Sequence, residues 1–328
     1  MTAAGKYKKY ILLILFNIVS VSVLMLLFEM IIRIAVPSIH PLGTERKLMT
    51  DRMYGSSAGL KPSVEGKSNG AAFATDQYGF RKNSVAVDTS KESILLLGDS
   101  VTMGIGVESD SVFSARLQRA RPDVNVLNPS LVGYDIGDYS NLLDHFLVQK
   151  QFHLRKVFVF FCLNDVYAGS VDQIEQPGGG IRKYFNWILN SLRAESMGYQ
   201  FLKDLFTDRQ KSYFDYDSRF YNTSNTSFNH TVSMLAEMKK RAEGKNVELK
   251  VILLPYEYQL REPRTASVFF PQQLLTRELS KWDIHAFSLL QQLHLKNSKD
   301  YYLFGDGIHF SEAGHRLISE QLLLHSLF

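Results

Sequence analysis

Apolar residues follow two different patterns along the 328-residue chain. Near the N-terminus, residues 10–28 form an almost unbroken apolar run whose polar members are Asn17, Ser20 and Ser22. With its extension to residue 36, the run supplies the about 20 apolar residues that a helix needs to cross a bilayer. From residue 93 onward, short apolar runs alternate with segments of helical spacing. The first pattern predicts one transmembrane helix, and the second predicts an α/β domain.

The alternation beyond residue 92 indicates a parallel sheet. Strands are expected at 94–97, 124–127, 157–163 and 249–254, and helices at 111–120, 139–148 and 312–327. Continuous apolar strands separated by helices are typical of βαβ units whose sheet is covered on both faces. Residues 171–229 break this rhythm, with a helical stretch expected near 181–206. We interpret this segment as an insertion on one rim of the sheet, either a lid or a decorative loop.

The flanks of the N-terminal run predict its orientation. Lys6, Lys8 and Lys9 precede it, so the positive-inside rule holds the N-terminus in the cytoplasm and places the rest of the chain in the periplasm or outside the cell. A cleaved signal peptide is the first alternative, but its apolar region is shorter and a small-residue site follows it. A buried core helix is the second alternative.

The expected division of the chain is a cytoplasmic tail at 1–9, a signal anchor at 10–36, a juxtamembrane stalk and packing segment at 37–91, and the α/β domain at 92–328.

Composition narrows the function classes. The formal net charge is only +4, and no basic block interleaved with aromatic residues suggests a nucleic-acid partner. Cys162 is the single cysteine, which excludes an intrachain disulfide and any multi-cysteine metal site.

Two short motifs carry candidate catalytic chemistry. Ser100 ends a Gly-Asp-Ser tripeptide directly after an expected strand and before a helix, where open α/β sheets bind ligands. The G-x-S-x-G signature is absent, because Thr102 occupies its last position. Asp306 and His309 lie three residues apart before the last helix, and such a pair can supply a base whose tautomer is fixed by a carboxylate. Alone, the first motif could be a simple turn and the second a helix cap beside a surface histidine.

Two further residues follow expected strands. Asn164 ends the strand 157–163, where its amide can donate to an oxyanion, although asparagine also ends strands by bonding its own backbone. Gly133 follows the strand 124–127, and a glycine allows the backbone N–H to approach an oxyanion closely.

Together, these four blocks in this order resemble the SGNH (GDSL) hydrolase superfamily, over about residues 93–328. The resemblance implies a three-layer, flavodoxin-like sandwich and no cofactor. It makes Ser100 the nucleophile, His309 the base and Asp306 its partner, with Ser100, Gly133 and Asn164 forming the oxyanion hole. The third block of the family usually begins with glycine, where this chain has Cys162.

The resemblance and the expected anchor imply a membrane-bound serine esterase acting outside the cytoplasm, on O-acetyl or other acyl esters of envelope carbohydrate. Three alternatives stay open: a polysaccharide O-acetyltransferase, a lipase or thioesterase, and a catalytically idle carbohydrate-binding subunit. Envelope polysaccharide assembly proteins are the expected protein partners. A zinc site of Asp306, His309 and His315 would leave Ser100 unexplained, so we expect no metal.

Overall fold

The computed structural model describes residues 3–166, 189–190, 192, 194–261, 264–293, 295 and 297–328. The chain divides into two compact units. The smaller unit comprises residues 1–41 and 179–207, and the larger unit comprises residues 42–178 and 208–328. The sequence-based division at residue 92 placed the start of the folded part later than this.

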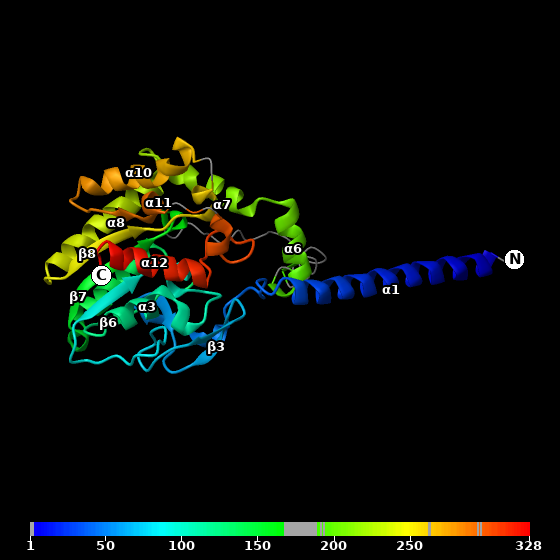
Figure 1. Cartoon of the computed structure of the whole chain (residues 1–328), viewed down its shortest axis with the longest axis horizontal. Helices are drawn as coiled ribbons and strands as arrows, with labels where there is room; N and C mark the ends of the chain where they lie inside the picture. The colour runs from blue at the N-terminus through cyan, green and yellow to red at the C-terminus, as the bar shows by residue number, and fades with distance from the viewer. Residues whose placement is uncertain are drawn as a thin grey trace. The chain divides into compact units, whose positions relative to one another are not determined.

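A five-stranded parallel sheet lies at the centre of the larger unit (Figure 1). Its strands are β5 (Ser93–Leu97), β6 (Asn125–Leu127), β7 (Leu154–Phe161), β8 (Glu248–Leu253) and β9 (Phe287–Ser288). Their spatial order is β6-β5-β7-β8-β9, and every neighbouring pair is parallel. Numbered from β5, this is the order 2-1-3-4-5 of flavodoxin-like folds. The predicted α/β class with a central parallel sheet is confirmed.

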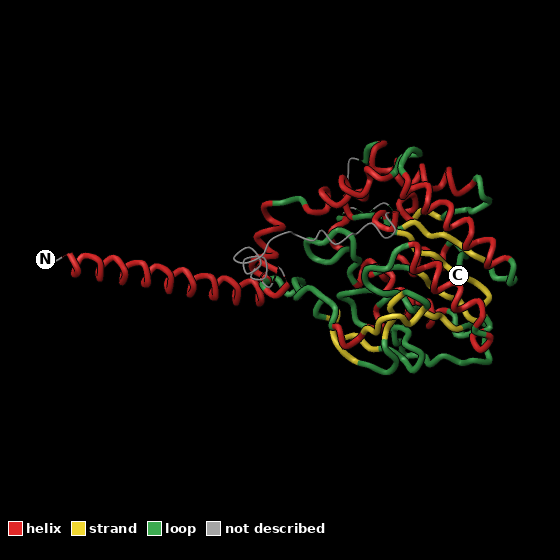
Figure 2. Tube along the Cα trace, turned by 180° about the vertical axis from the view of Figure 1, so that it is seen from behind, coloured by secondary structure: helices red, strands yellow, loops and turns green. Residues whose placement is uncertain are grey.

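Helices surround the sheet. In Figure 2 the yellow strands lie among the red helices. The α-helices are α2 (Ser100–Met103), α3 (Phe113–Ala120), α4 (Ile136–Val148), α7 (Arg209–Asp217), α8 (Thr226–Glu243), α9 (Glu257–Leu260), α10 (Ala266–Ser280), α11 (Leu289–Gln292) and α12 (Glu312–Leu324). The 3-10 turns are η1 (Arg46–Leu48), η2 (Ser109–Ser111), η3 (Lys150–Phe152), η4 (Leu163–Val166), η5 (Ser218–Phe220) and η6 (Ser298–Tyr301). Helix α3 packs against α12, while α8 packs against α4 and α10. Because crossovers between parallel strands are almost always right-handed, the reversal of strand order at β5 puts these two groups on opposite faces of the sheet.

The core explains why the apolar runs become central strands. All five residues of β5 are buried, and so is the second half of β7 from Val157 to Phe161. Phe160 of β7 meets Phe113 of α3 with ring centroids 4.7 Å apart. Burial of each such side chain contributes about 1.5–3 kcal/mol to folding.

The segment expected as a juxtamembrane stalk and packing segment is largely folded. It contains two antiparallel hairpins, β1 (Met49–Tyr54) with β2 (Ser57–Leu60) and β3 (Glu65–Ser68) with β4 (Ala71–Ala74). Leu48, Tyr54, Leu60, Phe73 and Phe80 from this segment are buried in the main core. These short strands contain glycine, serine and charged residues and lack a clear period-two pattern of apolar positions. Their sequence therefore did not predict strands.

The smaller unit contains α1 (Ala3–Ala35) and α6 (Met197–Phe206). Residues 9–35 of α1 are long and apolar enough to cross a membrane, with a mean hydropathy of 2.8, and none of the tested window is buried. That exposure argues against the core-helix alternative. The last part of the helical stretch expected near 181–206 is observed as α6, whereas residues 171–188, 191 and 193 of the insertion lie outside the described residues.

Candidate active site

The turn after β5 presents Ser100 at the carboxyl edge of the sheet. Gly98 closes the strand, and a Cβ there would lie 1.9 Å from Thr102 Oγ1, so the turn requires glycine. Asp99 caps α2, because its Oδ1 accepts the Val101 N–H at 2.9 Å. Ser100 is the first residue of α2 and is only 7% exposed.

Three predicted site residues come together as a hydrogen-bonded chain. Ser100 Oγ lies 2.8 Å from His309 Nε2. On the other side of the imidazole, Nδ1 lies 2.9 Å from both carboxylate oxygens of Asp306. An ionised carboxylate only accepts hydrogen bonds, so Nδ1 carries a proton and Nε2 is left to accept the serine proton.

The geometry of the 306–309 turn is set locally. The Oδ1 atom of Asp306 also accepts the backbone N–H groups of Ile308 and His309, at 2.9 and 2.8 Å. Gly307 has a φ of +81°, and a Cβ at this position would lie 2.2 Å from Gln210 Cγ. The turn therefore needs glycine for its backbone conformation and for space. The Glu257 N–H donates to the Gly307 carbonyl at 2.8 Å, which attaches the turn to the start of α9.

Electrostatics favour the protonated form of this base. Burial disfavours the charged imidazole, but the charge and hydrogen bond of Asp306, with a smaller contribution from Asp99, raise the pKa of His309 above its ordinary value. Burial alone would raise the pKa of Asp306, yet the charge of His309 and the hydrogen bonds from His309 and Ile308 lower it. Asp306 is therefore ionised at neutral pH and holds His309 ready to accept a proton.

The strand order places the two other predicted oxyanion donors on either side of Ser100. Strands β6 and β7 flank β5, so the loop with Gly133 follows one neighbour and Asn164 follows the other. Gly133 is exposed, has a φ of +83°, and has no atom within 4 Å of where a Cβ would be. The Asn164 Nδ2 group donates to Asp99 Oδ2 at 3.3 Å, which directs the amide toward the nucleophile turn.

Two residues that the sequence analysis missed support Asn164. The Tyr256 hydroxyl lies 3.1 Å from Asn164 Oδ1 and 2.6 Å from Asp217 Oδ2. The phenol therefore lies on the carbonyl side of the amide, and Nδ2 faces Asp99. Tyr256 closely follows the predicted strand 249–254. Its expected position at the same edge of the sheet could have identified it as a candidate site residue. Asp217 ends α7, in the insertion, where no strand or motif pointed to a site residue.

Cys162 occupies the place of the glycine in the third family block without opening the loop. Its side chain is buried, and its N–H donates to Asp165 Oδ2 at 2.7 Å. The Asp165 N–H donates back to the Cys162 carbonyl at 3.1 Å. These two bonds close the turn that carries Asn164.

His315 belongs to the core. It is fully buried in α12, its Nδ1 accepts the Phe113 N–H at 3.3 Å, and its ring stacks on that of Phe113. Among the described residues, no group of three histidine, cysteine or acidic side chains could hold a metal ion.

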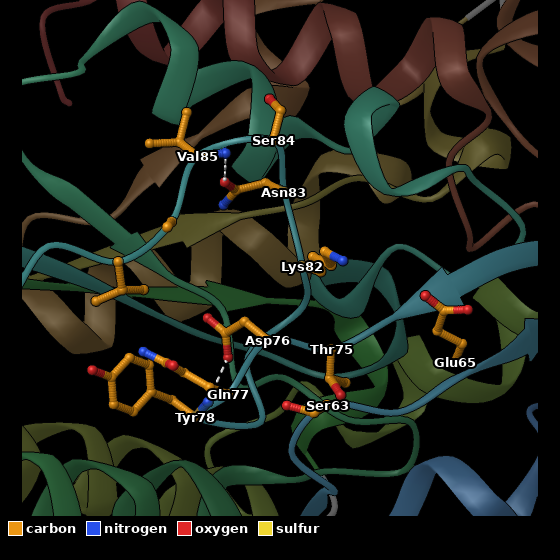
Figure 3. A pocket seen from close by; sticks show the side chains of 12 residues that line it. Ser63, Glu65, Thr75, Asp76, Gln77, Tyr78, Lys82, Asn83, Ser84 and Val85 are labelled. Atoms are coloured by element: carbon orange, nitrogen blue, oxygen red, sulfur yellow. Dashed lines mark hydrogen bonds between the residues drawn. The ribbon is translucent and has the colours of Figure 1, made fainter.

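A recess of about 480 Å³ lies in the segment before β5 (Figure 3). Two side chains that line it bond to the backbone of the surrounding loop. Asp76 accepts the Tyr78 N–H, and Asn83 accepts the Val85 N–H. None of the predicted site residues lines this recess.

No protein-family model and no curated protein sequence matches the chain. Solved structures that it resembles include a lipolytic protein of the G-D-S-L family from Veillonella parvula, with 12% identity and a TM-score of 0.39. A lipase/acylhydrolase from Enterococcus faecalis has 15% identity and a TM-score of 0.42, and an acetylxylan esterase from Geobacillus stearothermophilus has 15% and 0.41. The matches cover 71%, 71% and 72% of this chain and 97%, 94% and 94% of those chains. Similarity this low does not transfer an activity, so the chemistry must be argued from the chain's own residues.

Proposed function

We propose that this protein is a serine ester hydrolase of the SGNH type. The single observation that carries the proposal is the continuous Ser100–His309–Asp306 chain, with distances of 2.8 and 2.9 Å. A serine hydroxyl becomes a nucleophile when a base accepts its proton and a carboxylate orients that base.

In the proposed reaction, Ser100 Oγ forms a bond to the acyl carbon while its proton moves to His309 Nε2. The carbonyl oxygen becomes an oxyanion, for which Asn164 and the backbone N–H groups of Gly133 and Ser100 are the proposed donors. The bond to the alcohol oxygen then breaks, and His309 returns the proton to that oxygen. Water attacks the acyl-enzyme with the same base and releases the carboxylic acid. Attack by a sugar hydroxyl in place of water would give acyl transfer.

We propose O-acetyl groups of envelope carbohydrate as the substrate class, with the domain on the periplasmic or extracellular side. Support comes from α1, whose apolar length suits a membrane anchor, and from the lysines before its apolar run. Protease added to spheroplasts should digest the domain and leave a small membrane-bound fragment. Protection until lysis would reverse the topology.

The activity is tested with the full-length chain in detergent on acetyl and long-chain p-nitrophenyl esters. We expect faster hydrolysis of the acetyl ester and no turnover by Ser100→Ala, while circular dichroism shows that the variant is folded. Normal turnover by that variant would contradict the assignment of the nucleophile. Product analysis with a carbohydrate acceptor separates hydrolysis from transfer.

A further inference from the structure

Helix α6 is held to the C-terminal end of α1 by one carboxylate. Glu29 accepts hydrogen bonds from Ser196 Oγ at 2.8 Å, from the Met197 N–H at 3.0 Å and from the Gly198 N–H at 2.8 Å. Arg33 donates to Glu29 at 2.8 Å and to the Glu195 carbonyl at 3.0 Å. The carboxylate thus satisfies the orphan N–H groups at the start of α6, and the guanidinium balances its charge.

The contact between the two helices is close. A Cβ on Gly198 would lie 3.0 Å from atoms of both Phe28 and Glu29, so glycine permits this approach. The rings of Phe28 and Phe201 meet edge to face, with centroids 6.4 Å apart. Figure 1 shows α6 crossing α1 near the end of that helix.

The apolar stripe of α6 is wider than its contact with α1. Leu202, Leu205 and Phe206 are 41%, 64% and 78% exposed. Their spacing of three and four residues places them on one side of the helix. Because Gly198 and Phe201 lie four residues before Leu202 and Leu205, the exposed side chains continue the stripe that touches α1.

The C-terminal end of α1 also exposes apolar side chains. Met30, Ile31 and Ile34 lie in the turns that carry Glu29 and Arg33, and they are 59%, 60% and 79% exposed. An apolar surface shared by a membrane-spanning helix and a helix docked at its end is suited to the boundary between acyl chains and headgroups.

From this continuity, we propose that α6 is an interfacial helix, with Leu202, Leu205 and Phe206 inserted into the phospholipid leaflet that surrounds the C-terminal end of α1. The inference rests on the proposed role of α1 as a membrane span and is independent of the ester chemistry. The occupant of the stripe is phospholipid, and Glu29 fixes the orientation of α6 on the anchor.

The test uses the full-length chain in phosphatidylcholine–phosphatidylglycerol vesicles, with a spin label on Phe206→Cys. Asp204→Cys is the matched control, because residue 204 lies on the opposite side of α6, and the unsubstituted chain, whose Cys162 is buried, is the labelling blank. We expect the label at 206 to collide with oxygen several-fold more than the control and with a water-soluble nickel complex several-fold less. Equal nickel accessibility at 206 and 204 would overturn the proposal. Shielding of 206 from both reagents would also overturn it, because a protein or a second copy would then cover the stripe.

A label on Ile18→Cys and ester turnover of the same samples identify the cause of a failure. Oxygen-rich surroundings at 18 with aqueous surroundings at 206 would overturn the role of α6 alone. Nickel accessibility at 18 would overturn the span and the α6 proposal together. Turnover is expected to be unchanged by these labels, and absence of turnover in the unsubstituted chain would count against the esterase assignment instead.

Glu29→Ala tests the attachment. We expect the label at 206 to become more mobile and to lose its preference for oxygen. Asn17→Ala is the control, because the Asn17 side chain bonds within α1, to the Leu13 carbonyl. An unchanged label in Glu29→Ala would overturn the role given to Glu29.

Discussion

The turn that carries His309 and the helix that carries His315 lie close together in the sequence, yet they give the same side chain opposite properties. His309 has a carboxylate on Nδ1 and a serine hydroxyl on Nε2, and the carboxylate raises its pKa. His315 is stacked on Phe113, and burial, with smaller contributions from nearby positive charges, lowers its pKa to about 3. The groups around the imidazole therefore decide whether a histidine is suited to accept a proton or to pack in the core.

Removal of the base should have the largest effect. His309→Ala should lower kcat for ester hydrolysis by about 10⁴–10⁶-fold, similar to Ser100→Ala, because the two residues act as one unit. The double variant should be little worse than either single variant. Additive losses in kcat would show that the two side chains act separately.

Asp306→Asn should lower kcat by about 10⁴-fold or less, because it disturbs the tautomer of His309 but leaves the base in place. The base acts in its neutral form, so kcat/KM falls as the pH drops through the raised pKa of His309. Asp306 supports that raised pKa, and the acidic limb of the profile should move to lower pH in the variant. A limb that stays in place would assign the limiting pKa to another group.

Asn164→Ala should lower kcat by about 10²–10³-fold, the usual effect of removing one oxyanion donor. KM should change little, because the hydrogen bond strengthens only as negative charge develops. A variant that mainly raises KM would identify Asn164 as a ground-state contact.

Tyr256→Phe should lower kcat by up to about tenfold, the equivalent of one net hydrogen bond, while KM stays close to its original value. The melting temperature should also fall, because the variant removes the buried hydrogen bond from the phenol to Asp217. The expected cause of the lower kcat is looser orientation of the Asn164 amide. In the Asn164→Ala background the same change should have almost no further effect on kcat. An equal loss in both backgrounds would show that Tyr256 does not act through Asn164.

His315→Ala should have the smallest effect on kcat and a clear effect on stability. The variant leaves a cavity and removes the acceptor of the Phe113 N–H, which costs about 1–3 kcal/mol for the unpaired group alone. Denaturant unfolding measures this loss, and ester turnover at low temperature is the control. A folded variant without turnover would move His315 from the core to the catalytic machinery.

Short-range patterns predicted the parts of the fold that local sequence determines. The apolar runs at 94–97 and 157–163 became β5 and β7, and Ser100, Asp306 and His309 meet as the resemblance to SGNH hydrolases implied. The long helix α8 was missed, although its buried Phe228, Leu235 and Ala242 follow helical spacing.

Other features depend on contacts distant in sequence, which no local pattern reveals. The two hairpins before β5 are short, and their stability comes from burial of residues such as Tyr54 and Phe73 in the main core. Tyr256 contacts both Asn164 and Asp217, so this network connects the ends of β7, β8 and α7. Tyr256 can reach Asn164 because β7 and β8 are neighbours in the sheet. The turn that contains Cys162 is closed by Asp165, whose carboxylate accepts the Cys162 N–H.

The 209 positions that separate Ser100 from His309 have a consequence for biosynthesis. In a chain made from its N-terminus, Ser100 is synthesised long before His309. Pairing across such a distance requires closure of a long loop, which slows folding relative to local contacts. Ser100 and His309 can therefore pair only late in the maturation of the nascent protein, once the turn near the C-terminal end has been synthesised.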